Sequence, residues 1–152
     1  MSKQKSLQRL LRIRELEEER KRLGLAAAMS RLDRLASARD AAVHRARDGR
    51  SRVARSAISG EVVDRQAGLI EAEAARRRAR MLEMQIVQSR QEAAACRQDL
   101  LAKRMERRQT ETVLQHEEVR EKSESDRKSQ KSVDDWYGVK THRQAADDRG
   151  GE

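Results

Sequence analysis

The residue types that most often do chemistry in enzymes are scattered along this chain of 152 residues. His44, His116 and His142 lie far apart, and none has a second histidine or cysteine at the i+3 or i+4 spacing that would form a zinc pair on a helix. The only cysteine, Cys96, lies on an apolar stripe, where a small core residue is expected more often than a nucleophile. The seven glycines form no phosphate-binding loop. The sequence therefore predicts a protein that is not an enzyme and that carries no cofactor or metal.

Two groups of arginines could bind nucleic acid through phosphate contacts. One group is Arg76, Arg77, Arg78 and Arg80, and the other is Arg45, Arg47, Arg50, Arg52 and Arg55. No aromatic residue is interleaved with either group for base stacking, and no zipper follows a basic region. A solvated helical face is the simpler interpretation, so we expect no specific nucleic acid. A basic protein that binds nucleic acid remains the alternative function.

The composition indicates which elements must position these side chains. Charged residues make up 40% of the chain, the formal net charge is +9, and there is no proline, no phenylalanine, one tryptophan and one tyrosine. Such a chain cannot fill an ordinary globular core with aromatic side chains, whereas abundant Ala, Glu, Lys, Leu and Arg are typical of long helices. A single cysteine and the lack of a long apolar run predict a cytoplasmic protein without a membrane span.

Apolar residues recur at alternating intervals of three and four residues, which predicts helices that pair along a heptad seam. The first expected seam consists of Leu25, Ala28, Leu32, Leu35, Arg39, Ala42, Ala46, Gly49 and Val53. The second consists of Val63, Ala67, Ile70, Ala74, Arg77, Met81 and Met84, followed by a stripe of Leu82, Ile86, Ala93, Cys96 and Leu100. The upstream apolar residues are out of register with the first seam, which predicts a stutter near residues 23–28; they are Leu7, Leu10, Leu11, Ile13, Leu16 and Leu23.

The best break between the two seams is Ser59-Gly60, since glycine suits the left-handed position that ends a helix and serine could cap the next one. Asp48-Gly49 is a second candidate turn. We therefore predict an all-α fold, a long antiparallel two-helix coiled-coil hairpin over residues 1–138. Its helices would span about 2–58 and 61–137, with the turn at 59–60. One continuous helix in a parallel dimer is the alternative.

A turn at Gly60 would place Met1 opposite roughly position 120, so that the rest of the second helix would overhang. Residues 120–132 contain no apolar residue, yet Trp136 and Tyr137 follow them. Exposed aromatic side chains on a polar helix are the kind of anchor that dominates an interface. The sequence predicts a partner-binding tip there and a short disordered tail over residues 139–152.

Both ends of the chain resemble the FliJ family of flagellar export proteins and its YscO-type relatives in injectisomes. The N-terminal segment is LQRLLRIRELEEER, from Leu7 to Arg20, and the C-terminal one runs from Glu106 to Gly138. In the latter, Gln130-Lys131 is followed by the acidic pair Asp134-Asp135 and by Trp136, which is similar to a pattern common in the family.

The resemblance implies a hairpin similar to the stalk of rotary ATPases, monomeric alone, with the end that bears both termini inserted into the hexameric export ATPase. It also implies contacts with the export-gate membrane protein and with export chaperones, and a cytoplasmic location peripheral to the inner membrane. The residues expected at the ATPase are Gln130, Lys131, Asp134, Asp135, Trp136 and Tyr137, with Leu7, Arg9, Leu10 and Arg12 added by their proximity to that end. For the gate, a patch of Leu69, Ile70 and Ala74 is expected, although these residues would also serve the seam. A generic structural scaffold is a further alternative.

Overall fold

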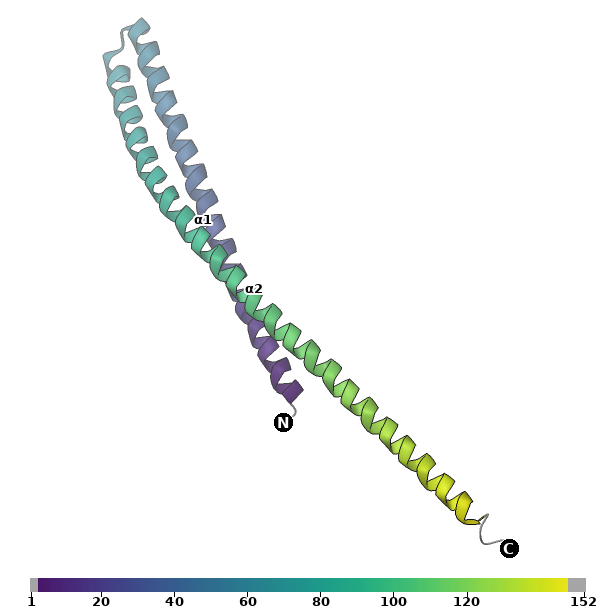
Figure 1. Cartoon of the computed structure of the whole chain (residues 1–152). Coiled ribbons are helices and arrows are strands. Elements are labelled where there is room, and N and C mark those ends of the chain that lie inside the picture. The colour runs from purple at the N-terminus through teal and green to yellow at the C-terminus, as the bar shows by residue number, and fades with distance from the viewer. Residues whose placement is uncertain (1–2, 148–152) are drawn as a thin grey trace. The chain divides into compact units, whose positions relative to one another are not determined.

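The computed structural model describes residues 3–147, and over that range it consists of two long α-helices without a strand (Figure 1). Helix α1 spans Lys3–Ser59 and helix α2 spans Val62–Asp147. The chain contains no proline to interrupt either helix. Ion pairs one turn apart, such as Arg77–Glu73 at 3.0 Å and Arg120–Glu124 at 3.0 Å, add a little support to the helical backbone. The predicted all-α fold is confirmed.

The turn lies where the sequence predicts it, at Gly60. This residue has a φ of 76°, a left-handed conformation that a glycine adopts without steric penalty, and its N–H donates to the carbonyl of Ser56 at 2.9 Å. Ser59 still belongs to α1, so the prediction that it caps the second helix is wrong. The Glu61 carbonyl accepts the first helical hydrogen bond of α2, from the Arg65 N–H at 3.2 Å. The alternative turn at Asp48-Gly49 is excluded, because both residues lie inside α1.

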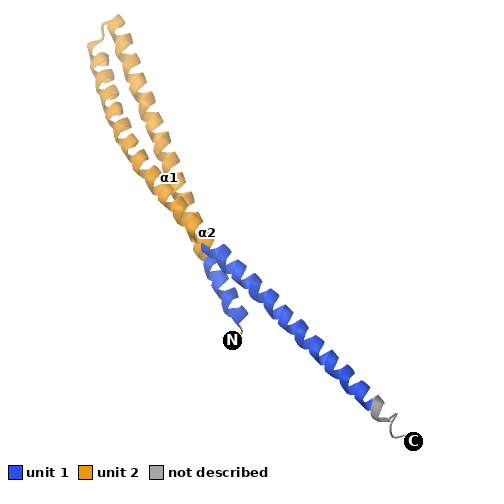
Figure 2. Ribbon diagram, in the orientation of Figure 1, with its two compact units in different colours: residues 1–15, 106–152 blue, residues 16–105 orange. Residues whose placement is uncertain are grey.

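The chain divides into two compact units (Figure 2). Unit 2, residues 16–105, is a helical hairpin around Gly60. Cross-helix ion pairs join Arg52 to Glu71 at 3.5 Å, Arg31 to Glu92 at 3.3 Å and Lys21 to Asp99 at 3.0 Å. In these pairs the residue number in α1 decreases as the residue number in α2 increases, so the two helices are antiparallel in this unit. The alternative of one continuous helix is excluded.

The predicted seam of α1 is confirmed. All nine of its expected residues, from Leu25 to Val53, are buried or half-buried. The stutter is wrong, because the same spacing continues backwards from Leu25 through Lys21 and Glu18, which are also half-buried. Leu16 and Leu23 are exposed instead. Charged side chains can take seam positions here because they pair across the seam, as Lys21 does with Asp99 and Glu18 with Arg104 at 3.1 Å.

The first part of the predicted α2 seam is wrong except at Ala67, which is half-buried. Val63 and Ile70 are 79% and 71% exposed, and Ala74, Arg77, Met81 and Met84 are exposed as well. The neighbouring stripe that begins at Leu82 is confirmed, and it extends towards the turn through smaller residues. The buried residues of α2 in unit 2 are Gly68, Ala72, Ala75, Ala79, Leu82, Ile86, Ser89, Ala93 and Leu100.

A close contact between two glycines explains why the small residues of α2 are buried. A Cβ built on Gly49 would lie 2.8 Å from the Gly68 carbonyl oxygen and 2.8 Å from the Ala72 nitrogen. A Cβ on Gly68 would lie 2.8 Å from the Gly49 oxygen. The two backbones therefore touch, and only glycine and alanine occupy the α2 seam opposite Gly49. Ile70 and Met81 are too large for it, so the helix faces them away.

Unit 1 combines residues 1–15 of the chain with residues 106–152, of which the structure describes 3–15 and 106–147. Lys3 pairs with Glu117 at 2.8 Å, and Arg14 pairs with Glu106. Leu114 is buried, and it lies between Glu106 and Glu117 in the sequence. The Lys3–Glu117 contact agrees with the expectation that the start of the chain lies opposite roughly position 120.

The end of α2 differs from the prediction. The helix passes through Gly138 and continues to Asp147, so a helix end near Tyr137 and a disordered tail from residue 139 are wrong as far as Asp147. A glycine inside an exposed helix destabilises it by only about 1 kcal/mol relative to alanine. The Thr141 hydroxyl donates to the carbonyls of Tyr137 and Gly138 at 3.1 and 2.9 Å, which holds the next turn. Residues 148–152 of the expected tail lie outside the described residues.

Candidate protein-interaction surfaces

The terminal stretch of α2, residues 118–143, exposes every one of its side chains. Trp136 and Tyr137 are each 58% exposed, and their rings meet edge to face with centroids 5.0 Å apart and an interplanar angle of 78°. The Lys140 Nζ lies 5.1 Å from the centroid of the Trp136 ring, within range of a cation–π interaction. The stretch therefore presents an ordered aromatic pair with a cation beside it.

The residues around Trp136 combine apolar side chains with charges of both signs. Val133 precedes it by three residues and Lys140 follows it by four, so the three share one face of the helix. Val133 is also exposed. Asp134 and Asp135 lie off this face by register, and neither forms an ion pair within the described residues. The combination of apolar side chains, one cation and adjacent carboxylates suits a protein partner with a matching pocket.

The residues predicted for the ATPase contact fall into two groups that the structure does not bring together. Gln130, Lys131, Asp134, Asp135, Trp136 and Tyr137 all lie exposed in the terminal stretch. The second group, Leu7, Arg9, Leu10 and Arg12, lies in α1 between Lys3, which contacts Glu117, and Arg14, which contacts Glu106. It is therefore flanked by residues 106–117 of α2 and not by the terminal stretch. Leu7 is half-buried and the other three are exposed.

The residues predicted for the gate contact, Leu69, Ile70 and Ala74, are exposed. The expectation that they also serve the seam is wrong for all three. Ile70 and Ala74 belong to what we call the outward stripe of α2, which consists of Val63, Ile70, Ala74, Met81 and Met84. These residues keep the heptad spacing that the sequence shows, but the face they form is not covered by α1.

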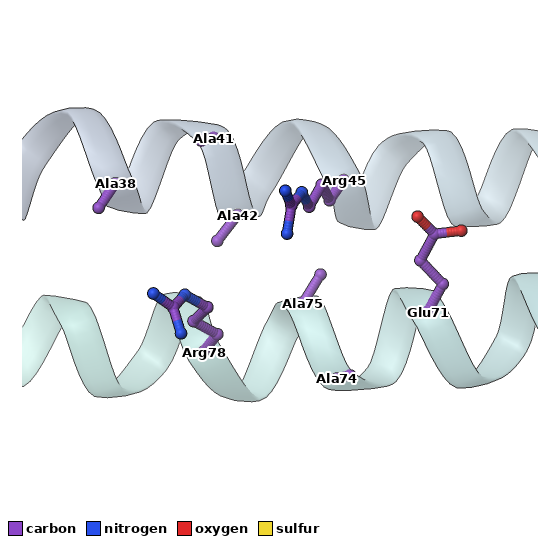
Figure 3. A pocket seen from close by; sticks show the side chains of 8 residues that line it. All are labelled: Ala38, Ala41, Ala42, Arg45, Glu71, Ala74, Ala75 and Arg78. Carbon is purple, nitrogen blue, oxygen red and sulfur yellow. The ribbon is translucent and has the colours of Figure 1, made fainter.

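The arginine groups of unit 2 are interleaved with carboxylates. Glu73 accepts a hydrogen bond from Arg77 at 3.0 Å and lies 3.9 Å from Arg80, and the bond from Arg77 lowers the pKa of Glu73 below its usual 4.5. A groove of about 400 Å³ between the two helices is lined by Arg45, Glu71 and Arg78 together with alanines of both helices (Figure 3). Such local pairing weakens the field that would attract phosphates.

Other residues that could do chemistry are isolated. Among the described residues, no group of three or more His, Cys, Asp and Glu side chains could hold a metal ion. Cys96 is half-buried within the α2 seam, which agrees with its predicted place on an apolar stripe. In the described part of the chain, no helix is both long and apolar enough to span a membrane.

Two features were missed from the sequence. The Gly49–Gly68 contact could have been found from a glycine in each helix with alanines one turn away. The cation beside Trp136 was missed because Lys140 had been assigned to a disordered tail. Comparisons of the chain with protein-family models, with curated proteins and with solved structures gave no match.

Proposed function

We propose that this protein is a non-enzymatic stalk of a bacterial flagellar or related type III export apparatus, which inserts into the hexameric export ATPase and couples it to the export gate. The observation that carries the proposal is the terminal stretch, an exposed helix of polar residues that ends in the Trp136–Tyr137 pair. The resemblance of both ends of the chain to the FliJ and YscO proteins supports the same assignment.

The proposed scaffold is an antiparallel coiled coil of α1 and α2. Its support is the alternation of three- and four-residue intervals between buried residues in both helices, which is the spacing of a heptad seam. In unit 1, Lys3 contacts Glu117 and Gln4 contacts Glu118, and every side chain from residue 118 to residue 143 is exposed. On this basis we propose that the terminal stretch overhangs the hairpin.

The exposed terminal stretch would contact the ATPase. Trp136 offers the largest side chain for a pocket on the partner, and Lys140, Asp134 and Asp135 offer charges around it. Gln130 and Lys131 lie one to two turns earlier and would extend the contact. Leu7, Arg9, Leu10 and Arg12 would form a second contact along unit 1. Leu69, Ile70 and Ala74 remain the candidate gate contact, and chaperones would bind elsewhere on the exposed helices.

The proposal is tested with the double variant Trp136→Ala/Tyr137→Ala, in a pull-down and an ATPase assay with the hexameric export ATPase. We expect binding to weaken by about 2 kcal/mol or more, since exposed aromatic anchors carry effects of that size, and stimulation of ATP hydrolysis to fall accordingly. Helicity should stay unchanged, because neither side chain packs into a seam.

The matched control is Leu16→Ala/Leu23→Ala, which removes two exposed apolar side chains from α1. If the aromatic variant binds the ATPase and stimulates ATP hydrolysis as well as this control does, the proposed contact at Trp136 and Tyr137 is excluded. Retention on duplex DNA that falls steeply with salt would favour the nucleic-acid alternative instead.

A further inference from the structure

The outward stripe of α2 has the spacing of a helix–helix interface but no helix packed on it in unit 2. Its members Val63, Ile70, Ala74, Met81 and Met84 are all exposed. Ile70 precedes Ala72 by two positions, Met81 follows Ala79 by two, and Met84 follows the buried Leu82 by two, which corresponds to roughly 200° around an α-helix. The stripe therefore lies on the side of α2 that is turned away from α1, with Ala74 at its edge beside the groove between the two helices.

Heptad spacing on this side favours a helical partner, because apolar intervals of three and four residues over several turns are typical of a helix–helix seam. Arg77 lies in the middle of the stripe. A partner helix can accommodate its long side chain if a small residue lies opposite it. A lipid surface fits less well, since the stripe has no aromatic anchor and carries flanking charges of both signs.

The charges beside the stripe are arranged by sign along the helix. Glu71 and Glu73 come before its midpoint, whereas Arg78 and Arg80 come after it. A partner helix should therefore be basic where this one is acidic and acidic where this one is basic. The same segment, turned end to end, has that pattern.

We propose that the partner is a second copy of this chain, docked antiparallel through the outward stripe with a two-fold axis between Ala75 and Arg76. In this arrangement Ile70 packs against Met81 of the second copy, and Arg77 lies across Ala74 of the second copy with its guanidinium reaching solvent. The heptad register places Glu73 beside Arg80 of the second copy, and Glu71 beside Arg78 of the second copy. Each of these contacts occurs twice by symmetry.

Existing ion pairs are exposed and do not prevent this exchange. Glu71 pairs with Arg52 of α1 at 3.5 Å, but both side chains are close to half exposed, so this pair contributes little to stability. The pairs of Glu73 with Arg77 and Arg80 lie within one helix and are exposed, so they contribute little to stability. Arg78 forms no ion pair within the described residues, and it lines the groove two turns away from Glu71 (Figure 3). A second copy would give Arg78 a carboxylate and would give Glu73 a second cation.

The first test is sedimentation equilibrium of the full chain over a range of concentrations up to about 1 mM. We expect a shift from the mass of one chain to that of two, and a weakening of at least about a hundredfold in Ile70→Glu, which buries two carboxylates in the proposed interface. The control Leu23→Glu changes a side chain of similar exposure on α1, and it should dimerise as the parent does. A single-chain mass at every concentration would overturn the proposal.

A charge exchange tests the antiparallel register. Glu73→Arg and Arg80→Glu should each weaken the dimer by about tenfold, since each introduces two like-charge contacts. The combination Glu73→Arg/Arg80→Glu restores opposite charges and should recover most of the affinity. A double variant as weak as the sum of the two single changes would contradict the proposed register.

Cross-linking tests the direction of the two helices in a Cys96→Ala background. Ile70→Cys mixed with Met81→Cys should form a disulfide between the two variants, whereas Ile70→Cys alone should not cross-link to itself. Cross-linking of Ile70→Cys alone would indicate a parallel dimer and would overturn the proposal. These outcomes do not depend on the proposed ATPase contact, because Trp136 and the rest of the terminal stretch lie outside the interface. The dimer would cover Ile70 and Ala74, so it and the proposed gate contact exclude each other on one chain.

Discussion

Near the turn, Gly49 of α1 and Gly68 of α2 touch through backbone atoms, whereas in the terminal stretch every described side chain is exposed. Both regions are regular α-helix. The first is held by packing that admits no additional atom, and the second relies on helix propensity and on contacts one turn apart. A substitution should therefore change the free energy of unfolding in the first region and partner binding in the second.

The largest expected effect comes from adding one methyl group at the glycine contact. Gly49→Ala or Gly68→Ala places a Cβ about 2.8 Å from backbone atoms of the other helix, which must move apart. We expect a loss of about 2–3 kcal/mol in the free energy of unfolding, as for other overpacked cores, measured by urea denaturation.

The control for the glycine contact is Gly24→Ala in α1. A Cβ at Gly24 would meet no atom within 4 Å, so the better helix propensity of alanine should stabilise the protein by about 0.5–1 kcal/mol. Equal effects of the two substitutions would mean that the backbones do not touch as described.

A smaller effect is expected from the hydroxyl of Ser89, which is buried in the α2 seam without a hydrogen-bond partner. Ser89→Ala removes this unpaired group and should raise the free energy of unfolding by about 1 kcal/mol. Ser30→Ala, at an exposed position of α1, should give only the gain of about 0.5 kcal/mol due to helix propensity. A destabilised Ser89→Ala protein would mean that the hydroxyl has a partner.

In the terminal stretch, the corresponding change is Gly138→Ala. A Cβ there would meet nothing within 4 Å, so we expect a local stabilisation of about 0.5–1 kcal/mol in the last turns of α2. Hydrogen exchange should slow for amides around residue 138, while the free energy of global unfolding stays the same. An increase in global stability would show that this stretch packs against another part of the protein.

Lys140→Gln tests the cation beside Trp136. The chemical shifts of the Trp136 ring protons should change, and the affinity of the proposed ATPase contact should fall by about 0.5 kcal/mol, the size of an exposed cation–π interaction. Lys128→Gln removes the same charge two turns before Trp136 and should leave those shifts as they are.

The smallest effect is a pH dependence in unit 1. The hydrogen bond from Lys3 lowers the pKa of Glu117 below its usual 4.5, so the folded state binds this proton more weakly than the unfolded state. The stabilisation is thus present above pH 4.5 and is lost as the pH falls through the lowered pKa. In Lys3→Gln the NMR-titrated pKa of Glu117 should rise towards its usual value, and an unchanged pKa would contradict the pairing.

The parts of the fold that follow local rules were predictable from the sequence. Gly60 ends α1 because a left-handed residue is needed there, and the α1 seam follows from its own apolar spacing. The α2 seam depends on a contact between residues far apart in sequence. There Ile70 and Met81 dominate the local apolar pattern, but the close approach of Gly49 and Gly68 selects the alanines.

The candidate site was predictable to a similar extent. Exposure of Trp136 and Tyr137 followed from the polar sequence before them, since residues 120–132 offer no apolar face to pack. The cation of Lys140 did not, because Gly138 was taken as the end of the helix. A single glycine does not overcome the propensity of the residues around it.

The glycine contact also fixes how force passes along unit 2. If α2 slid by one heptad relative to α1, Gly49 would meet either Glu61 or Ala75 instead of Gly68, and either side chain would collide with the backbone. The two helices therefore resist shear, and an axial push on one of them is delivered to the other without slippage. A hairpin pinned in this way behaves as one mechanical strut.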